Sequence, residues 1–360
     1  MEPSNRSADI RSNRPASRAA ITVLMSCYNC ETTVGAAVES ILTQSYRDFR
    51  LVIYDDGSTD GTATALKCYD DPRIDLRLLS ENRGLSQNLH EGLIEAETPY
   101  IARMDSDDIA LPERLADQIE FLESHPSVDV LGTNVLFFTE KGDKFLGIQP
   151  EHHEEIAISL FFDFTMLHPT IMMRTSALSE RNWNYNPRFI YSQDFDLWSR
   201  MIPEHRFYNL QKPLLLLREH PRKISRAKRS KQQRFTTLIR ARQIKRVRPD
   251  VTLNEVLTFS AAARGDLPKN AEALDRLESC LLRLVEGNEI TKVYEPHSFN
   301  SAAANLMDEI CRQMLRAGKI AGSRYLVSPL RKHAVSHTVK SQLKFAGLCG
   351  IALLKRRIFV

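Results

Sequence analysis

Short apolar runs alternate with amphipathic segments from Ile21 onward, and this alternation limits the possible folds more than any other feature of the sequence. The runs have the length of buried strands, and the segments between them repeat apolar residues at three- and four-residue spacing, as amphipathic helices do. Strands separated by helices at intervals of roughly 25 to 30 residues predict parallel pairing with right-handed crossovers, and hence an α/β fold. Strands are expected at Ile21–Ser26, Leu51–Asp55, Ile74–Ser80 and Tyr100–Met104, and helices at Thr33–Leu42, Gly61–Tyr69 and Gly84–Glu95.

Polar side chains follow each of these four strands. Because the carboxyl ends of parallel strands meet at one edge of a sheet, where such folds bind ligands, these side chains are expected to line one crevice. Ser58 or Asp60 is expected to cap the next helix, but capping does not explain two acidic clusters and an Asn-Arg-Gly turn on the same edge. The four segments are Ser26-Cys27-Tyr28-Asn29, Asp55-Asp56-Gly57-Ser58-Thr59-Asp60, Glu81-Asn82-Arg83-Gly84 and Asp105-Ser106-Asp107-Asp108.

The Asp-x-Asp formed by Asp105 and Asp107 predicts a site for a divalent cation. Carboxylate oxygens suit hard ions such as Mg²⁺ and Mn²⁺, which proteins commonly share with substrate phosphates. One residue separates the two aspartates, so in an extended chain their side chains point to the same side. The position of the motif directly after a buried strand supports this interpretation.

The rest of the chain continues the α/β pattern and then becomes mainly helical. A helix is expected from Pro112 to about His125, a strand at Val128–Phe138, a helix that starts near Gln193 and a strand at Leu214–Leu217. The first residues are rich in Arg, Ser, Asn and Pro and lack the apolar core of a signal peptide. We therefore expect a disordered leader (1–20), a catalytic α/β domain (21–225) and a basic helical region (226–360).

The polar segments, in this order, resemble those of the family 2 glycosyltransferases, which have a nucleotide-binding GT-A fold. The resemblance covers about residues 20 to 225, and its motifs are specific together although none is specific alone. It implies a Rossmann-like mixed sheet flanked by helices and an inverting transfer of one sugar from a nucleoside-diphosphate sugar. UDP is the expected nucleotide, with dTDP and GDP left open. The matching segments are Val23–Asn29, Val52–Asp60, Asn82-Arg83-Gly84-Leu85, Ala102–Asp108 and Ser192–Trp198.

The resemblance also implies roles on the donor side. Tyr28 would offer an aromatic face to the base, Asp56 or Asp55 would accept a hydrogen bond from the base, and Asp107 would hold the metal that bridges the diphosphate. Asp105 would lie near the ribose. The implied donor-binding residues are Ser26, Tyr28, Asp55, Asp56, Asn82, Arg83, Asp105, His220 and Arg222, and the implied metal ligands are Asp105, Asp107 and His220.

Two further segments belong to this donor side. The segment Ser86-Gln87-Asn88 departs from the Ala-Arg-Asn that many family members have, at a position that would contact the pyrophosphate or the ribose. His220 lies in a segment that resembles one able to close over the diphosphate, where Arg218, Arg222 and Ser225 would help to neutralise phosphate charge.

An inverting transfer also needs a general base, because a protonated hydroxyl is a poor nucleophile. Asp194 matches the base of the family, and on a helix it shares a face with Trp198 while Asp196 points away. Gln193 stands where a Glu usually precedes the base, on the acceptor side of the site. His168, in a His-Pro-Thr that also matches, is expected either to border the acceptor or to be structural.

Charge divides the chain into an acidic and a basic half. Residues 1–221 contain 21 Lys and Arg against 34 Asp and Glu, whereas residues 222–360 contain 28 against 11. The last residues, apolar at Phe345–Leu354 and then basic, are too short to span a bilayer but suit an anionic membrane interface. We expect a cytoplasmic protein that contacts the inner membrane face near a glycan or glycolipid acceptor. No nucleic-acid module is recognisable.

Other functions fit the sequence less well. A nucleotidyltransferase predicts a glycine-rich loop after the first strand, and the segment from Ser26 to Thr33 contains none. A catalytically silent scaffold with the same fold predicts the loss of Asp107 or Asp194, and both are present. A processive synthase predicts transmembrane helices and a Gln-x-x-Arg-Trp motif, and neither is recognisable in the sequence. The pair Cys27 and Cys30 has no second pair at zinc spacing, so the cysteines are interpreted as reduced thiols.

Overall fold

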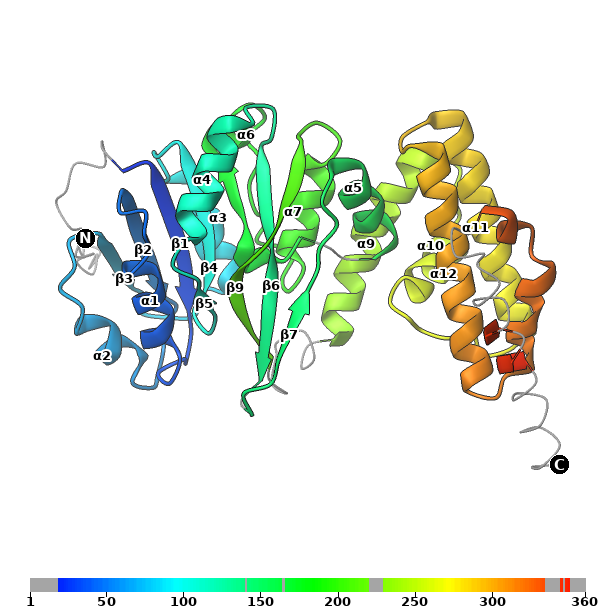
Figure 1. The fold of residues 1–360 in the computed structure, drawn as a ribbon, viewed down its shortest axis with the longest axis horizontal. Coiled ribbons are helices and arrows are strands. Elements are labelled where there is room, and N and C mark those ends of the chain that lie inside the picture. The colour runs from blue at the N-terminus through cyan, green and yellow to red at the C-terminus, as the bar shows by residue number, and fades with distance from the viewer. Residues whose placement is uncertain are drawn as a thin grey trace, which may run out of the picture. The chain divides into compact units, whose positions relative to one another are not determined.

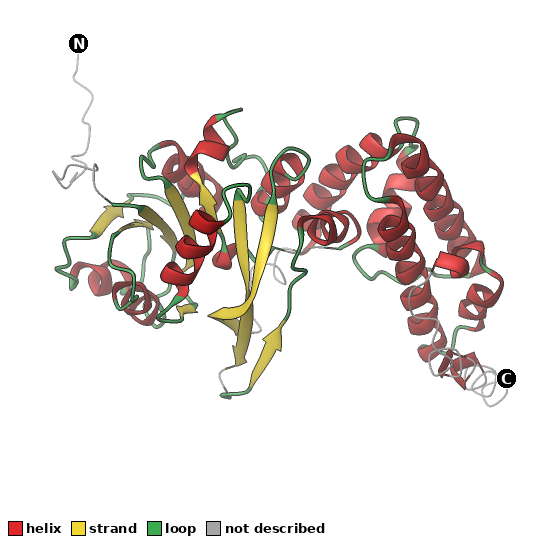
Figure 2. Ribbon diagram, turned by 45° about the horizontal axis from the view of Figure 1, so that its top comes forward, coloured by secondary structure: helices red, strands yellow, loops and turns green. Residues whose placement is uncertain are grey.

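The computed structural model describes residues 19–139, 141–163, 166–219, 229–333, 344–345 and 347–349. These residues form two compact units, shown as a ribbon in Figure 1. The first is drawn from Met1–His153 and Thr165–Gln232, and the second from Glu154–Phe164 and Gln233–Val360. The first unit contains the sheet, and the second is helical (Figure 2). The expected mixed α/β fold followed by a helical region is confirmed.

The four strands expected first in the sequence all form, as β1 (Ile21–Cys27), β2 (Phe49–Asp55), β3 (Ile74–Leu78) and β4 (Tyr100–Asp105). They lie in the order β3-β2-β1-β4 and pair in parallel. The helices between them are α1 (Val34–Leu42), α2 (Thr62–Lys67) and α3 (Leu85–Ile94). After β3 the chain returns to the far side of β1 to form β4. This reversal of direction places the carboxyl ends of β1 and β4 at a topological switch point, where open α/β sheets bind ligands.

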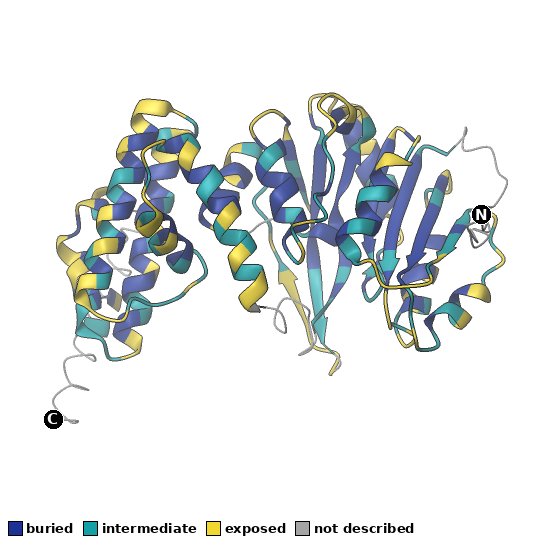
Figure 3. Cartoon of the chain, turned by 180° about the vertical axis from the view of Figure 1, so that it is seen from behind, coloured by how far each residue is buried: buried dark blue, intermediate teal, exposed yellow. Residues whose placement is uncertain are grey.

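Helices cover both faces of this part of the sheet. On one face, Val23 and Met25 of β1 belong to a core that includes Val38 of α1 and Ile119 of α4 (Arg114–Ser124). On the other face, Leu24 meets α3 at Gly92, where an added Cβ would approach the leucine methyl groups to 3.0 Å. Residues on both faces of β1 are therefore buried, and Figure 3 shows the strands of the first unit coloured mostly as buried. A two-sided core of this kind explains the uninterrupted apolar runs in the sequence.

The sheet continues beyond β4 with a different pairing pattern. It follows the order β4-β8-β6-β9-β5, with β7 paired to β6, and most of these contacts are antiparallel. β6 and β9 pair in parallel, with register shifts near Asn134. The elements are β5 (Ile109–Ala110), β6 (Val130–Thr139), β7 (Lys144–Gly147), η1 (His168–Thr170), β8 (Met172–Arg174), α6 (Thr175–Ser179), α7 (Gln193–Met201) and β9 (Phe207–Glu219).

One strand was predicted with the wrong length. The sequence predicts a strand at Leu214–Leu217, whereas β9 runs from Phe207 to Glu219. The polar segment Gln211-Lys212-Pro213 breaks the apolar pattern, and it lies where β9 is out of register with β6. The pairing with β6 therefore continues across a bulge that an apolar-run argument cannot detect.

The second unit is built around aromatic side chains. Phe161, on α5 (His153–Phe162), packs its ring 5.1 Å from that of Phe259, 5.2 Å from that of Phe299 and 5.4 Å from that of Tyr294, measured between centroids. α5 thus belongs to the second unit although it lies in the middle of the first in sequence. The other elements are α9 (Arg229–Val247), which begins in the first unit, α10 (Leu253–Ala262), α11 (Ala271–Thr291), α12 (Pro296–Arg316), η2 (Ile320–Val327) and η3 (Pro329–His333).

Polar caps delimit the helices of this unit. Thr252 and Glu255 form a capping box at the start of α10, and Asn270 accepts a hydrogen bond from the Ala273 N–H at the start of α11. Glu295 caps α12, whose first residue is Pro296. Among the helices that the structure describes, none is long and apolar enough to cross a membrane. Most of the expected leader and of the apolar C-terminal segment lies outside the described residues.

Candidate active site

The expected donor residues do meet at one edge of the sheet. In the register of the parallel strands, Ser26 lies beside Tyr54 of β2 and beside Asp105 of β4, and Cys27 lies beside Asp55. The Ser26 hydroxyl accepts a hydrogen bond from Asn88 of α3 at 3.0 Å. Tyr28 follows β1 and has 49% of its surface exposed, so an aromatic face is presented to solvent at this edge. The structure therefore places Ser26, Tyr28, Asp55 and Asp105 at the same edge of the sheet.

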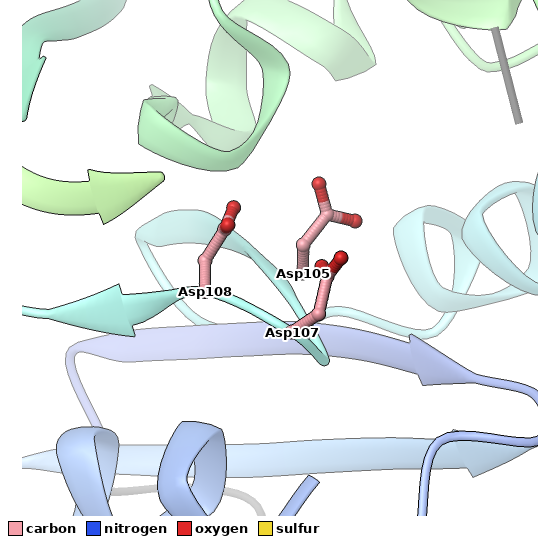
Figure 4. Close-up of side chains that lie close together, drawn as sticks. All are labelled: Asp105, Asp107 and Asp108. Carbon is pink, nitrogen blue, oxygen red and sulfur yellow. The ribbon is translucent and has the colours of Figure 1, made fainter. Parts of the chain in front are cut away.

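Three carboxyl groups gather at the end of β4 and on the loop that follows it (Figure 4). Oxygen atoms of Asp105, Asp107 and Asp108 all lie within 4.8 Å of one another. Asp108, which the sequence analysis does not name as a ligand, is buried, and its pKa is raised well above its usual value by burial and by the two neighbouring carboxylates. Oxygen donors at this spacing fit a hard divalent cation, because a positive ion relieves both the repulsion and the desolvation of the carboxylates.

Arg218, near the end of β9, holds this acidic loop in place. Its backbone N–H donates to Asp108 Oδ1 at 2.8 Å, and its Nε donates to the backbone oxygen of Asp107 at 2.9 Å. Its guanidinium lies 4.6 Å from the centroid of the Phe138 ring on β6. The expected residues His220, Arg222 and Ser225 follow Arg218 directly but lie outside the described residues, so the structure places none of them.

Two buried arginines lie next to the acidic loop, and the sequence analysis did not identify either of them. Arg103, on β4 and only 2% exposed, forms an ion pair with Asp105. Arg114, at the start of α4, donates to the backbone oxygen of Arg103 at 2.7 Å, and burial lowers the pKa of Arg114 to about 9. Of the two, Arg103 could have been noticed in the sequence, as a charged residue inside an otherwise apolar strand. Their charges partly balance the three carboxylates, which is how the fold tolerates this cluster at a half-buried site.

Asp194 lies in the first turn of α7 and interacts with the same cluster. Burial raises the pKa of its carboxyl to about 6, the charge of Asp105 also raises it, and the charge of Arg103 opposes the increase. Its Oδ1 accepts a hydrogen bond from the Phe195 N–H at 2.8 Å. Asp196 forms an ion pair with Arg200 on the same helix at 2.9 Å and is fully buried. The two aspartates thus have different environments, in keeping with the predicted opposite faces.

The aspartates after β2 have structural partners. Both oxygens of Asp56 accept hydrogen bonds from the β3–α3 turn, from the N–H groups of Arg83 and Gly84, each at 2.9 Å. Asp55 Oδ1 accepts from the Ser58 N–H at 3.2 Å. Gly57, at φ 68°, allows the two loops to approach, since a Cβ there would lie 2.6 Å from the backbone of Glu81. Asp56 therefore fixes the turn that presents Asn82 and Arg83.

Arg83 has an acidic partner that its position in the motif does not reveal. Its guanidinium binds both carboxyl oxygens of Glu91 on α3, at 2.8 and 3.0 Å. Asn82 stands beside it on the exposed part of the turn. A phosphate group of the donor would have to compete with this carboxylate for Arg83. To make the expected donor contact, the Arg83 guanidinium must either bind Glu91 and the phosphate together or leave Glu91.

His168 is buried and hydrogen-bonded to another side chain of the site. Its Nε2 lies 2.7 Å from the hydroxyl of Tyr185, and burial lowers the pKa of the imidazole well below its usual value. Tyr185 interacts electrostatically with Arg103, Asp194 and Asp105, and burial raises its pKa. Tyr185 could not be predicted from the sequence, because it lies in an irregular segment without a recognisable motif. A neutral His168 therefore fixes the ring of Tyr185 beside the carboxylates.

Comparison with known proteins identifies the family. The model of the family "Glycosyl transferase family 2" matches residues 22–183. The putative glycosyltransferase EpsE of Bacillus subtilis is 40% identical over 204 residues, which cover 55% of this chain and 73% of EpsE. This chain belongs to glycosyltransferase family 2. The O-antigen biosynthesis glycosyltransferase WbnJ of Escherichia coli is 32% identical over 206 residues, covering 56% of this glycosyltransferase and 80% of WbnJ.

Solved structures agree with the fold of this glycosyltransferase. Residues 1–349 of TarS from S. aureus, in complex with UDP-GlcNAc, superpose with a TM-score of 0.53 at 18% identity, covering 87% of this chain and 89% of TarS. The mannosyltransferase PcManGT of Pyrobaculum calidifontis, in complex with GDP-Man and Mn²⁺, gives a TM-score of 0.50 at 18% identity, with 92% of each chain covered. At this level of identity the likeness establishes the fold alone.

Proposed function

We propose that this glycosyltransferase moves one sugar, with inversion at the anomeric carbon, from a UDP-sugar to a glycan or lipid-linked glycan in cell-surface polysaccharide synthesis. One observation carries the proposal. A carboxyl group with a raised pKa, that of Asp194, interacts electrostatically with Asp105 of an acidic cluster at the same edge of the sheet. A base for the acceptor and ligands for the leaving group are the two requirements of a single displacement.

The donor side is assigned to the strand ends. Tyr28 would stack on the base, Asp55 and Asp56 would set the shape of the base pocket, and Asp105 would face the ribose. Asp107, with Asp105 and Asp108, would hold Mn²⁺ or Mg²⁺ close to the diphosphate. Such a cation, when bound, stabilises the negative charge that develops on the nucleoside diphosphate as it leaves. His220 and Arg222 remain assigned to the closing segment over the diphosphate, on the resemblance alone.

The acceptor side is assigned to Asp194. With a pKa of about 6, this carboxyl group is mostly ionised at neutral pH and still basic enough to take a proton from a hydroxyl group in the transition state. Tyr185, which interacts with Asp194 and is bonded to His168, would position the acceptor or the base. The arrangement gives Asp194 the environment that tunes a carboxylate for general-base work: partial burial, a like charge and a restraining arginine.

The substrate classes follow from the relatives. WbnJ is named for O-antigen biosynthesis, which supports a surface glycan as the acceptor here, and the TarS structure contains UDP-GlcNAc, which supports a UDP-sugar as the donor. The PcManGT complex with GDP-Man and Mn²⁺ supports a divalent cation and keeps GDP open as the nucleotide.

We also propose that the enzyme is cytoplasmic and contacts the anionic inner membrane face through its basic half. Residues 222–360 carry 28 basic and 11 acidic side chains, and charge of this sign is attracted to anionic headgroups. Fractionation of cells that express the chain with and without residues 341–360, at low and high salt, tests this idea. An unchanged soluble fraction in all four samples would rule out this segment as the anchor.

The stereochemistry of the transfer tests the proposed mechanism. The enzyme is incubated with a UDP-α-sugar and Mn²⁺ in the absence of acceptor, and the sugar released by slow hydrolysis is followed by ¹H NMR before its anomers equilibrate. A single displacement predicts that the β-anomer appears first. First appearance of the α-anomer would exclude inversion. Asp194→Asn is the matched control, because it removes the base and should abolish the release.

A further inference from the structure

Glu91 on α3 forms a two-point ion pair with Arg83, a residue assigned to the donor side. Arg83 Nη1 donates to Glu91 Oε1 at 3.0 Å, and Arg83 Nη2 donates to Glu91 Oε2 at 2.8 Å. Both side chains are partly exposed, 32% for Arg83 and 29% for Glu91. A guanidinium binds a phosphate group through the same kind of two-point contact. The Glu91 carboxylate therefore occupies an edge of Arg83 that a diphosphate could use.

Hydrogen bonds connect Arg83 to the strand ends that carry the proposed donor site. Arg83 Nη2 lies 3.5 Å from Asn88 Oδ1, and Asn88 Nδ2 donates to Ser26 Oγ at 3.0 Å. Ser26 lies directly beside Asp105 in the register of β1 and β4. The backbone N–H of Arg83 donates to Asp56 Oδ1 at 2.9 Å. The backbone of Arg83 is thus held at this edge of the sheet, and a change of partner requires a movement of its side chain.

Glu91 has a second partner that does not depend on Arg83. Gln87, one turn earlier on α3, donates from Nε2 to Glu91 Oε1 at 2.9 Å. If the Arg83 side chain turned away, the Glu91 carboxylate would keep this hydrogen bond and its contact with water, so it would not become a buried unpaired charge. Ion pairs that water reaches contribute little net stability. Separation of Arg83 from Glu91 therefore costs little.

We propose that Glu91 is a positioning residue that competes with the donor diphosphate for Arg83. When the donor binds, its phosphate oxygens replace the carboxylate on the guanidinium, and Glu91 remains bonded to Gln87. When the nucleoside diphosphate leaves, Glu91 takes Arg83 back, which assists the departure of the product. Glu91 thus lowers the affinity of the site for donor and product alike. Because it takes Arg83 as a donor-binding residue, the exchange rests on the proposed function of the site.

The sign of the effect on affinity distinguishes this role from a structural one. If the ion pair served to orient Arg83 for the donor, loss of the Glu91 charge would leave the guanidinium free to rotate, and the diphosphate would bind more weakly. If Glu91 competes with the diphosphate, loss of its charge makes the guanidinium available, and the diphosphate binds more tightly. Glutamine is the suitable replacement at position 91, because it keeps the length of the side chain and an oxygen that can accept from Gln87.

The experiment measures the affinity of the full-length protein for UDP and for inorganic pyrophosphate by calorimetry in the presence of Mn²⁺. We expect Glu91→Gln to bind both about fivefold more tightly than wild type, a change of about 1 kcal/mol. Arg83→Met should bind both more weakly, and adding Glu91→Gln to it should change the affinity less than about twofold, since coupled residues are not additive. The matched control is Glu95→Gln, which removes a charge paired with Arg77 at the end of α3 and should bind as wild type.

Each other outcome refutes a separate statement. Unchanged or weaker binding in Glu91→Gln, at an unchanged melting temperature, would refute the competition. An equal gain in Glu95→Gln, or a gain that persists beside Arg83→Met, would assign the effect to long-range charge and refute the exchange. Arg83→Met that binds both ligands as wild type does would refute the donor contact of Arg83 and with it the exchange. Wild type that binds pyrophosphate but no UDP would refute the proposed nucleotide, and the pyrophosphate titrations would still decide the role of Glu91. Wild type that binds neither would refute both.

Discussion

Replacing Asp194 by asparagine should make the catalytic unit more stable while it abolishes turnover. Asparagine has the same shape, keeps an oxygen that can accept the Phe195 N–H, and carries no charge. The wild-type carboxylate must ionise in a partly desolvated position next to Asp105. A residue can be retained at a functional site although its charge lowers the stability of the fold. Removal of that charge is then expected to increase the stability.

The size of the effect follows from the pKa of Asp194. An increase from 3.8 to about 6 corresponds to about 3 kcal/mol of destabilisation of the ionised form in the folded state. Between about pH 4 and pH 6 the folded state keeps this proton while the unfolded state has released it, so wild-type stability declines as the pH rises through this window. The advantage of Asp194→Asn should be absent near pH 4 and complete, at up to about 3 kcal/mol, above pH 7.

Fluorescence-monitored urea unfolding measures this difference in stability for the first unit, which contains Asp194. The chain has two tryptophans, Trp183 and Trp198, and both belong to the first unit. Unfolding of wild type and Asp194→Asn at pH 5 and pH 8, with EDTA to remove divalent ions, should show a larger gap at pH 8. The matched control is Asp196→Asn on the same helix. That change leaves Arg200 without its buried partner and should destabilise the unit at both pH values.

Either of two results would contradict this prediction. If Asp194→Asn is no more stable than wild type at pH 8, the carboxylate is not strained in the folded state. If the gap does not change between pH 5 and pH 8, the stabilisation has a cause other than the ionisation of Asp194. A gain of stability in Asp196→Asn would show that the assay responds to any loss of charge on α7.

Three further predictions concern the site and the second unit. The ratio kcat/KM should decrease as the pH is lowered through a midpoint near 6, because Asp194 becomes protonated. Arg103→Met should move that midpoint to higher pH, and pH–rate profiles measure both. Arg218→Met removes the side-chain hydrogen bond to the backbone oxygen of Asp107 and should weaken donor binding about fivefold or more by calorimetry, and an unchanged donor affinity would contradict this. Phe161→Ala should cost the second unit about 3–5 kcal/mol, seen as faster hydrogen exchange in α10–α12 but not in β1.

The strands at the centre of the sheet could be predicted because burial on both faces leaves a continuous apolar run. β1 and β4 are of this kind. The two- and three-residue strands β5 and β8 were not predicted, because so short a segment has no pattern and pairs only through contacts made elsewhere in the chain. The apolar residues of α5 likewise gave no indication that this helix packs in the second unit.

The candidate site divides in the same way. Its acidic residues could be predicted since they follow strands directly, and their order along the chain is that of a known family. The side chains that pair with the site residues and shift their pKa values could not be predicted. Arg103 appears in the sequence as an anomaly in an apolar strand, and Tyr185 has no motif at all. Glu91 pairs with Arg83 only because α3 folds back along the turn that carries the arginine. Such contacts depend on tertiary structure, which local patterns do not encode.

Donor binding and turnover, measured side by side, test the central claim most directly. Wild type, Asp107→Ala and Asp194→Asn are each titrated with UDP-, GDP- and dTDP-sugars, with and without Mn²⁺, and donor hydrolysis is followed in the same samples. We expect metal-dependent binding of one donor, at least tenfold weaker in Asp107→Ala, and full binding without turnover in Asp194→Asn. Wild type that binds no donor under any condition, or Asp194→Asn that turns the donor over at the wild-type rate, would contradict it.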